Sequence, residues 1–358
     1  MERERWYEEL LGRDRFQLPR EAGRSLASKR YLVTGGAGSI GSELVRRLRK
    51  LNPEKLIAFD NAEDRLYQLH RELACAGDDR TELVLGDVNS PRELRWILEK
   101  YRPDVVFHAA AHKHVDFLET QVLAAVRTNV FGTRNVLAAS TAAGVETVVV
   151  LSSDKATNPV SVLGASKRAA ELLVLMNASE SQVSAVRLCN VLGTAGSLLP
   201  LVIEQARTGM VSITDNDADR YFVSPQEAAD LLMSAASAGE CGVLVPTEAS
   251  RLNIHALVRR IIQDLGEGGK IRLEVTGLRA GEKLHEELYS EAEIVESATA
   301  AGLIKVSGPE FEGAAFFAAL EALEGAYFAG DESLVAEKLV NLVPEYRAAG
   351  RAPIPVSQ

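Results

Sequence analysis

Cysteine is scarce in this sequence, and long apolar runs are absent. The 358 residues include three cysteines, Cys75, Cys189 and Cys241, whose wide spacing fits neither a disulfide framework nor a metal site. The charged start differs from a signal peptide, and no run approaches the roughly 20 apolar residues that span a bilayer. These absences exclude disulfide-rich secreted proteins, and we expect a soluble, cytoplasmic protein without a membrane span.

An excess of positive charge is also missing. The 40 Lys and Arg residues stand against 50 Asp and Glu residues, which gives a formal net charge of -10. Nucleic-acid surfaces need clustered cations to bind phosphates, so we expect no nucleic-acid partner. A small anionic ligand stays compatible with this charge, because one helix N-terminus or a few cations suffice to hold a phosphate.

Short apolar runs alternate with longer amphipathic segments from residue 30 onward. This pattern predicts strands at residues 31–34, 55–60, 82–87, 105–108, 147–152 and 184–188. Between them it predicts helices at residues 39–51, 62–76, 90–101, 122–143 and 164–178. Strands that alternate with helices of this length form a parallel sheet covered on both faces. The predicted fold class is therefore α/β, a doubly wound parallel sheet of the Rossmann type.

The pattern differs at both ends of the chain. Residues 1–28 are charged and predict an N-terminal extension, helical near residues 6–11, that packs against the main body. After residue 187 the elements shorten, which suits a smaller C-terminal substrate-binding lobe with helices near residues 225–236, 254–265 and 316–323. The predicted division is a Rossmann domain at 29–187 with part of 216–250, a substrate lobe at 188–215 and 251–347, and a tail at 348–358.

A glycine-rich turn follows the first predicted strand. Gly35, Gly38 and Gly41 are spaced by three and lie between a strand and a helix. Glycine lets the backbone approach a pyrophosphate, which then sits on the N-terminal amides of the helix. Asp60, at the end of the next strand, suits the ribose hydroxyls and would repel a 2′-phosphate. The turn therefore predicts a dinucleotide site that favours NAD over NADP, although Arg65 nearby weakens that preference.

Several motifs together resemble one family. The sequence resembles an extended short-chain dehydrogenase/reductase in the glycine turn, residues 108–111, residues 128–130, residues 152–155 and Lys167. More narrowly, the sequence resembles the UDP-N-acetylglucosamine 4,6-dehydratases of polysaccharide biosynthesis. The stretches that carry this resemblance are 59–63, 110–115, 153–159, 164–168, 187–193, 277–283 and 342–347. The lead-in, Leu10-Leu11-Gly12-Arg13, is similar to the long, membrane-anchored members. We therefore expect the free catalytic part of such an enzyme.

The resemblance implies a reaction in which NAD is recycled. A hydride leaves carbon 4 of a UDP sugar, water is eliminated across carbons 5 and 6, and the hydride returns to carbon 6. It implies that Asp154 is the acid for the leaving hydroxyl, Lys155 the base at carbon 5, and Lys167 the holder of the nicotinamide ribose. A protonated Asp154 and a neutral Lys155 call for a desolvated site. Taken alone, the Asp154-Lys155 pair also fits a surface turn.

Residue 163 departs from the pattern of the wider family. The family has a tyrosine four residues before Lys167, where it deprotonates the 4-hydroxyl, and this sequence has Leu163. The long dehydratases also lack that tyrosine and usually have methionine there, so Leu163 favours this subgroup over an ordinary 4-epimerase. Loss of a general base costs about 10²–10⁴ in rate unless another group replaces it. Ser153, Asp154, Lys155 and water all stay open as that group.

The motifs also assign residues to the cofactor and to the substrate. The predicted cofactor-binding residues are Gly35, Gly38, Ser39, Ile40, Gly41, Asp60, Arg65, Asp87, Val88, Ala109, Ala110, Ala111, Asn129 and Lys167. The predicted substrate-binding residues are His112, Lys113, His114, Asn190, Arg220, Arg279 and Glu282. Asp87 equally fits a turn or a helix cap, and each arginine also fits a structural salt bridge. We expect no metal, because His112 and His114 lack a third ligand with suitable spacing.

Three functions stay open. The Asp154-Lys155 pair favours a 4,6-dehydratase acting on UDP-N-acetylglucosamine or a close relative. Return of the hydride to carbon 4 would instead make a UDP-sugar 4-epimerase, and the missing tyrosine also fits a catalytically silent NAD-binding regulator. The helices at 122–143 and 164–178 lie where related enzymes pair, so we expect a homodimer or a higher homo-oligomer.

Overall fold

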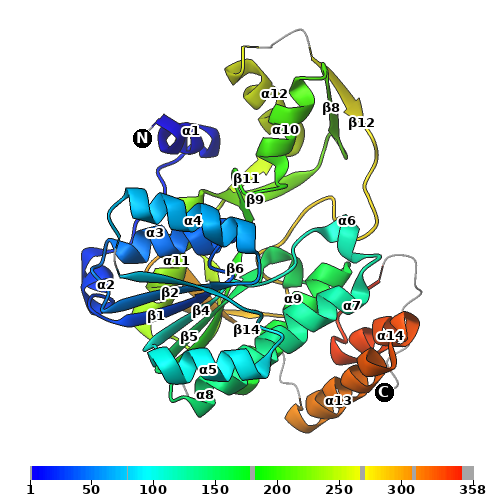
Figure 1. Ribbon diagram of the computed structural model, residues 1–358. Coiled ribbons are helices and arrows are strands. Elements are labelled where there is room, and N and C mark those ends of the chain that lie inside the picture. Colours follow the sequence, from blue (N-terminus) through cyan, green and yellow to red (C-terminus); the bar gives the residue numbers. More distant parts are fainter. Residues whose placement is uncertain (1, 79, 178–181, 267–270, 309–311, 349–358) are drawn as a thin grey trace.

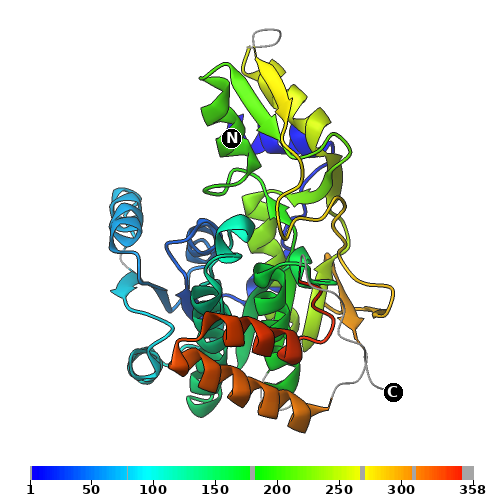
Figure 2. The ribbon, with the colours of Figure 1, turned by 90° about the vertical axis from the view of Figure 1, so that its right-hand side faces the viewer.

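The computed structural model describes residues 2–78, 80–177, 182–266, 271–308 and 312–348. Residue 178, the predicted end of one helix, and residues 349–358 of the predicted tail lie outside the described residues. A large sheet with helices on both faces forms the body, and a smaller lobe stands at one end of it (Figure 1 and Figure 2).

Among the described residues, nine strands form the main sheet. They are β1 (Arg30–Thr34), β2 (Lys55–Asp60), β3 (Thr81–Leu85), β4 (Val105–His108), β5 (Thr147–Ser153), β6 (Gln182–Leu188), β10 (Gly242–Pro246), β13 (Ile294–Ser297) and β14 (Leu303–Ser307). Their order is β13-β14-β10-β6-β5-β4-β1-β2-β3, and only the two pairings made by β14 are antiparallel. All six predicted strands are present, which confirms the predicted parallel sheet.

Helices cover both faces of this sheet. One face carries α2 (Arg20–Ser25), α3 (Ser39–Arg49), α4 (Glu63–Cys75) and α11 (Pro225–Ala238). The other carries α5 (Pro91–Tyr101), α8 (Thr133–Ala142) and α9 (Val162–Asn177). Apolar residues spaced three and four apart turn toward the sheet, as Leu44, Val45 and Leu48 do in α3. The predicted doubly wound Rossmann arrangement is therefore confirmed.

The helix predicted at residues 122–143 is interrupted. It consists of α7 (Val122–Ala125), a π-helical segment η1 (Val126–Gly132) and α8. Asn129 lies within η1, where its side chain bonds both the backbone amide and the carbonyl of His112. A π-helical turn shifts one residue out of the regular α-helical ladder, and such turns are frequent at functional sites. The sequence pattern predicts the correct apolar face of the helix at 122–143 but not its π-helical turn.

The smaller lobe has its own core and two small sheets. Its elements are β7 (Asn190–Val191), α10 (Leu198–Ala206), β8 (Met210–Ile213), β9 (Asp219–Val223), β11 (Ser250–Asn253), α12 (Ile254–Asp264) and β12 (Arg272–Val275). The N-terminal helix α1 (Glu2–Leu11) adds Tyr7, Leu10 and Leu11 to this core. The helix α1 of the predicted N-terminal extension therefore packs on the lobe. Among the described helices, none combines the length and apolarity needed to cross a membrane.

The segment after α1 joins the lobe to α11. Arg13 lies 2.8 Å from Glu227, and Arg15 lies 3.1 Å from Asp230, both of which are buried carboxylates of α11. Arg13 also donates to Ser250 Oγ on β11 of the lobe at 3.0 Å. One short stretch thus binds a sheet-covering helix and a lobe strand at the same time.

The C-terminal helices pack on the sheet domain rather than on the lobe. The helices α13 (Gly313–Ala329) and α14 (Glu332–Leu342) share the core that lies beneath α5, α8 and α9 (Figure 1). Phe131 and Tyr327 meet edge to face at 5.3 Å, and Arg134 pairs with Glu324 at 2.6 Å. The packing therefore differs from the predicted lobe boundary at 251–347, because residues from β13 onward complete the core of the main sheet.

These C-terminal helices also cover the predicted dimer face. Residues 162–174 of α9 are buried, and α14 contacts both α7 and α9. In Figure 2 the C-terminal helices, orange and red, lie across the front of the sheet domain. Among the described residues, α14 thus covers part of α7 and α9, which belong to the two predicted pairing helices. The predicted homo-oligomer stays a prediction.

Candidate active site

The glycine turn brings the ends of β1 and β4 together. Gly35 has a φ of 67°, and a Cβ atom there would lie 2.5 Å from the backbone nitrogen of Ala110. A Cβ atom on Gly41 would lie 2.0 Å from the carbonyl oxygen of Gly35. Real side chains do not fit at such distances, so both glycines are required by the close approach of backbone segments. This geometry suits a pyrophosphate placed on the first amides of α3.

Asp60 is held beside that turn. Its Oδ2 accepts the amide of Ala37 at 3.0 Å, and its Oδ1 accepts the amide of Ala62 at 2.9 Å. The two bonds fix the carboxylate at the end of β2 and leave further acceptor capacity on each oxygen. Ser39 Oγ accepts the amide of Ala195 from the lobe side at 3.2 Å. The residues present therefore fit a dinucleotide with free ribose hydroxyls.

The end of β3 is organised by a turn. Asp87 Oδ1 accepts the amide of Asn89 at 2.9 Å, and Asp87 Oδ2 lies 3.2 Å from Arg127. The cap of α5 is Ser90, whose Oγ accepts the amide of Glu93 at 3.3 Å. Val88 is buried in the core, so its side chain is structural. The side chain of Asp87 thus makes a turn, and its role toward adenine stays a prediction.

The loop after β4 is fixed by Asn129. The amide group of this side chain also donates to Ser166 Oγ at 2.9 Å, which links the loop to α9. Burial and the Arg127 guanidinium lower the pKa of His112, while desolvation and Arg65 lower the pKa of Lys113. Asn129 therefore fixes His112, a predicted substrate residue, directly after residues 109–111, which are predicted to line the cofactor.

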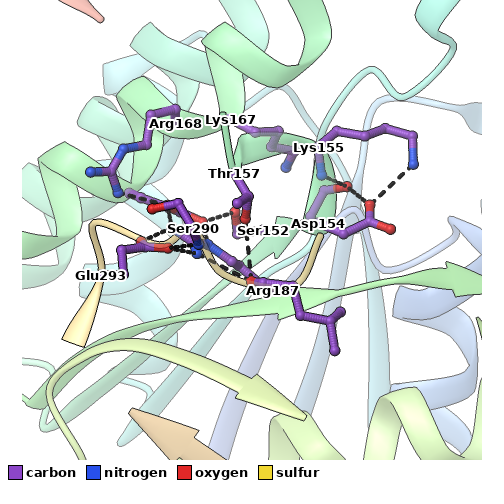
Figure 3. Close-up of polar contacts among 12 residues, drawn as sticks. Ser152, Asp154, Lys155, Thr157, Lys167, Arg168, Arg187, Ser290 and Glu293 are labelled. Atoms are coloured by element: carbon purple, nitrogen blue, oxygen red, sulfur yellow. Dashed lines mark hydrogen bonds and ion pairs between the residues drawn. The ribbon is translucent and has the colours of Figure 1, made fainter. Parts of the chain in front are cut away.

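Asp154 and Lys155 lie at the carboxyl end of β5, and they form a buried ion pair. The Lys155 Nζ atom is 3.0 Å from Asp154 Oδ1, which also accepts from Ser153 Oγ at 2.9 Å (Figure 3). Asp154 is fully buried, so the alternative of a surface turn is wrong. Burial lowers the pKa of Lys155, but the carboxylates of Asp154 and Glu286 outweigh it and raise that pKa above its ordinary value. Lys155 therefore carries the proton at rest.

Lys167 points back toward β5. Its Nζ donates to the carbonyl oxygen of Leu151 at 2.8 Å. Burial lowers the pKa of Lys167 to about 8, although the Glu171 carboxylate opposes this effect. Leu163 lies one turn earlier on α9 and is buried among apolar neighbours of the sheet domain.

A buried ion network lies behind this site. Arg187 binds Glu171 through two hydrogen bonds of 2.8 Å and Glu293 through bonds of 2.6 and 2.9 Å (Figure 3). Ser152 Oγ donates to Glu171 at 2.6 Å, and Arg168 Nη1 donates to it at 3.0 Å. The network joins β5, β6 and α9 to the segment that precedes β13. Sequence patterns missed it, because nothing in the spacing of these residues indicates that their charges are buried together.

The predicted substrate residues divide into two groups. Arg220 donates to the carbonyl oxygens of Lys283 and Leu284 at 2.7 and 3.0 Å. Arg279 pairs with Asp116 at 2.8 Å, while its amide donates to Glu282 at 3.1 Å. The structure thus uses both arginines to hold the chain segment near residue 280.

Two other predicted residues lie at the join between lobe and body. Asn190 donates to the carbonyl oxygen of Tyr221 at 3.2 Å. His114 packs against Gly196, where a Cβ atom would lie 2.4 Å from His114 Cε1. Among the described residues no group of three or more His, Cys, Asp or Glu side chains is arranged to hold a metal ion. The structure brings Asp154, Lys155 and Arg220 together with Glu286, a residue that the motifs did not assign.

Comparison with known proteins identifies relatives over most of the chain. Residues 31–307 match a family described as polysaccharide biosynthesis protein. The chain is 38% identical to the capsular polysaccharide biosynthesis protein CapD of Staphylococcus aureus, over 80% of this chain and 49% of CapD. It is 37% identical to the probable polysaccharide biosynthesis protein EpsC of Bacillus subtilis, over the same shares. The chain thus spans about half the length of these two relatives.

A UDP-glucose 4-epimerase of Rickettsia akari is 31% identical, over 78% of this chain and 82% of that protein. Among solved structures, Pen from Bacillus thuringiensis has a TM-score of 0.74 at 28% identity, over 79% of this chain and 90% of Pen. DesIV, a dTDP-glucose 4,6-dehydratase from Streptomyces venezuelae solved with NAD, has a TM-score of 0.64 at 25% identity, over 72% of this chain and 88% of DesIV. MoeE5 in complex with UDP-glucose and NAD has a TM-score of 0.61 at 27% identity, over the same shares.

The family match covers more than half of the chain, and the curated relatives exceed 30% identity over four fifths of it. The Rossmann sheet, the glycine turn and the relatives agree with the predicted extended short-chain dehydrogenase/reductase. The chain therefore belongs to the family described as polysaccharide biosynthesis protein.

Proposed function

We propose that this protein is an NAD-dependent 4,6-dehydratase of UDP-N-acetylglucosamine or a close UDP sugar, which yields a 4-keto-6-deoxy sugar. The single observation that carries the proposal is the buried Asp154–Lys155 pair at the carboxyl end of β5, where ligands bind in open α/β sheets. An acid and a base in direct contact suit an elimination, which moves one proton off carbon 5 and another onto the leaving hydroxyl.

The chain offers a complete set of residues for NAD. The amides after Gly38 would hold the pyrophosphate, Asp60 the adenosine ribose, and Lys167 the nicotinamide ribose. Bound NAD supplies the hydride acceptor that oxidises carbon 4 and then returns the hydride to carbon 6. The solved relatives DesIV and MoeE5, both of which hold NAD, support this assignment.

The acid and base forms arise within the pair. Movement of the Lys155 proton across the 3.0 Å bond to Asp154 gives a neutral amine and a carboxylic acid at once. The amine then takes the proton from carbon 5, whose electron pair forms the double bond to carbon 6. The carbon–oxygen bond at carbon 6 breaks, and the Asp154 proton joins the departing oxygen to make water. The elimination thus restores the resting charges of the pair. When the hydride returns to carbon 6, Lys155 gives a proton that has exchanged with solvent to carbon 5, and the proton lost by the 4-hydroxyl restores the charge of Lys155.

A 4-epimerase is the second candidate. The Rickettsia relative named as UDP-glucose 4-epimerase matches over 82% of its length, whereas CapD matches over 49% of its own. An epimerase would return the hydride to carbon 4 and would have no use for an acid at carbon 6. The Asp154–Lys155 pair therefore favours dehydration.

The test is incubation of the purified protein with NAD and UDP-N-acetylglucosamine in deuterated water. A dehydratase gives a product lighter by one water that carries deuterium at carbon 5. Asp154→Asn and Lys155→Met should each lower this turnover by about 10²–10⁴, while the exposed Glu287→Gln serves as the control. An isomer of unchanged mass would establish the epimerase instead, and absence of turnover with every nucleotide sugar would favour the silent regulator.

A further inference from the structure

Glu286 is a second carboxylate in contact with Lys155. Its Oε1 lies 3.4 Å from Lys155 Nζ, and the residue is 4% exposed. Its Oε2, like Oδ2 of Asp154, is buried without a hydrogen-bond partner among the described residues. The Lys155 ammonium therefore contacts two carboxylates that reach it from distant parts of the chain.

The segment that carries Glu286 is firmly anchored. Just before it, Lys283 Nζ donates to the carbonyl oxygen of Thr157 at 2.7 Å. Just after it, the carbonyl oxygen of Leu288 accepts from Thr157 Oγ1 and from Arg187, both at 3.2 Å. Figure 3 shows Thr157 and Arg187 close to the Asp154–Lys155 pair. Glu286 is thus positioned by the elements that also position the pair.

Four charged side chains among the described residues act on the Lys155 ammonium. Asp154 and Glu286 are the two carboxylates, Arg220 Nε lies 3.9 Å from Glu286 Oε1, and the Lys283 ammonium is a more distant cation. The buried Cys189 thiol also lies near the pair. One lysine between two carboxylates is held in its charged form, because an opposite charge this close favours ionisation.

We propose that Glu286 is a positioning residue that holds Lys155 Nζ beside Asp154 and stabilises the positive charge Lys155 gains when it takes the carbon 5 proton. This inference rests on the proposed dehydratase function. The bond from carbon 5 to hydrogen breaks, a bond from Nζ to hydrogen forms, and Glu286 neither gains nor loses a proton. Glu286 favours the charged lysine both at rest and after the carbon 5 proton has moved, so its contribution to the rate is to hold Nζ within reach of Asp154 and of carbon 5.

The matched variants are Glu286→Gln and Glu287→Gln. The first keeps the shape and removes the charge, and the second makes the same change on an exposed neighbour that accepts from Asn158 at 2.8 Å. Glu286→Gln should lower kcat about tenfold or more with little change in KM. It should also move the alkaline limb of the pH–rate profile to lower pH, because a lysine with one carboxylate fewer loses its proton at lower pH. Glu287→Gln should match the wild type in both respects.

A second measurement needs no turnover. Protein labelled with ¹³C at lysine Cε gives a Lys155 signal, which Lys155→Arg identifies by its loss. Its titration midpoint should fall in Glu286→Gln and stay unchanged in Glu287→Gln. If Glu286→Gln fails to fold, Glu286→Asp retains the charge and should show a lower kcat with the wild-type alkaline limb.

The outcomes separate the two proposals. An active wild type whose Lys155 midpoint and alkaline limb are the same in Glu286→Gln would overturn the role of Glu286 and leave the dehydratase intact. A fall in kcat with an unmoved profile would also overturn it, because such a loss reflects packing alone. A shifted midpoint in a protein that turns over no nucleotide sugar would support the electrostatic contact and refute the dehydratase.

Discussion

Arg187 and Glu171 form a two-bond ion pair in the protein interior, with Nε to Oε1 and Nη2 to Oε2 distances of 2.8 Å each. Both residues are fully buried. Burial raises the pKa of Glu171, but Arg187 and Arg168 outweigh this effect and lower it below its ordinary value. Arg187 is thus the counter-ion on which two buried carboxylates, Glu171 and Glu293, depend.

Arg187→Met should therefore be strongly destabilising. Removal of one partner leaves buried charge uncompensated, which costs about 3–5 kcal/mol in comparable cases. The free energy of unfolding in urea measures the loss. Arg5→Met is the control, because its ion pair with Glu9 is exposed and should contribute less than about 1 kcal/mol. A loss for Arg187→Met as small as that of the control would contradict the structural role assigned to the network.

Lys167 gives a pH dependence of stability with a definite sign. Its folded-state pKa of about 8 lies below the ordinary value of 10.5, so the unfolded chain binds more protons between these values. The wild type should accordingly gain free energy of unfolding relative to Lys167→Met as pH rises from about 8 toward 10.5. Paired denaturation curves across this range measure the difference. Parallel curves for the two proteins would show that Lys167 titrates normally.

Gly41→Ala should damage the cofactor turn. The new Cβ atom would lie 2.0 Å from the Gly35 carbonyl, so the backbone of the turn must move. We expect a loss of about 1–3 kcal/mol in stability, as for overpacking, and NAD binding weakened about tenfold or more. Gly325→Ala is the matched helical control, since a Cβ atom there meets nothing within 4 Å and should stabilise by about 0.5–1 kcal/mol. Calorimetric titration with NAD tests the pair, and equal NAD affinity in both variants would count against the site.

Leu163→Tyr should not be needed for activity. Leu163 is buried, so a larger side chain with a hydroxyl should cost about 1–3 kcal/mol, whereas Leu163→Met should cost less than about 1.5 kcal/mol. Turnover of UDP-N-acetylglucosamine by the three proteins decides the matter. An inert wild type together with an active Leu163→Tyr variant would refute the assignment to the tyrosine-less dehydratases.

Hydrophobic periodicity was sufficient to predict the sheet, because each buried parallel strand is a short apolar run and each covering helix repeats every three to four residues. The glycine turn was also predictable, since Gly35, Gly41 and Asp60 lie in a fixed order along one strand–turn–helix–strand unit. The predicted lobe segment at 251–347 is wrong from β13 onward, because the pattern of an amphipathic helix does not indicate which surface the helix covers. Glu286 was missed for a related reason. Glu286 and Glu287 are adjacent residues of the same type, so the sequence does not distinguish them. The packing of the chain buries Glu286 and leaves Glu287 exposed.

The folded unit begins before the first strand of the sheet and includes the stretch from α1 to Arg15. This stretch supplies three side chains to the core of the lobe and two guanidinium groups to buried carboxylates of α11. A shortened protein limited to residues 31–307, the span of the family match, would lose these and also the C-terminal helices over α7 and α9. Expression boundaries for this protein are therefore better drawn before α1 and after α14 than at the limits of sequence similarity.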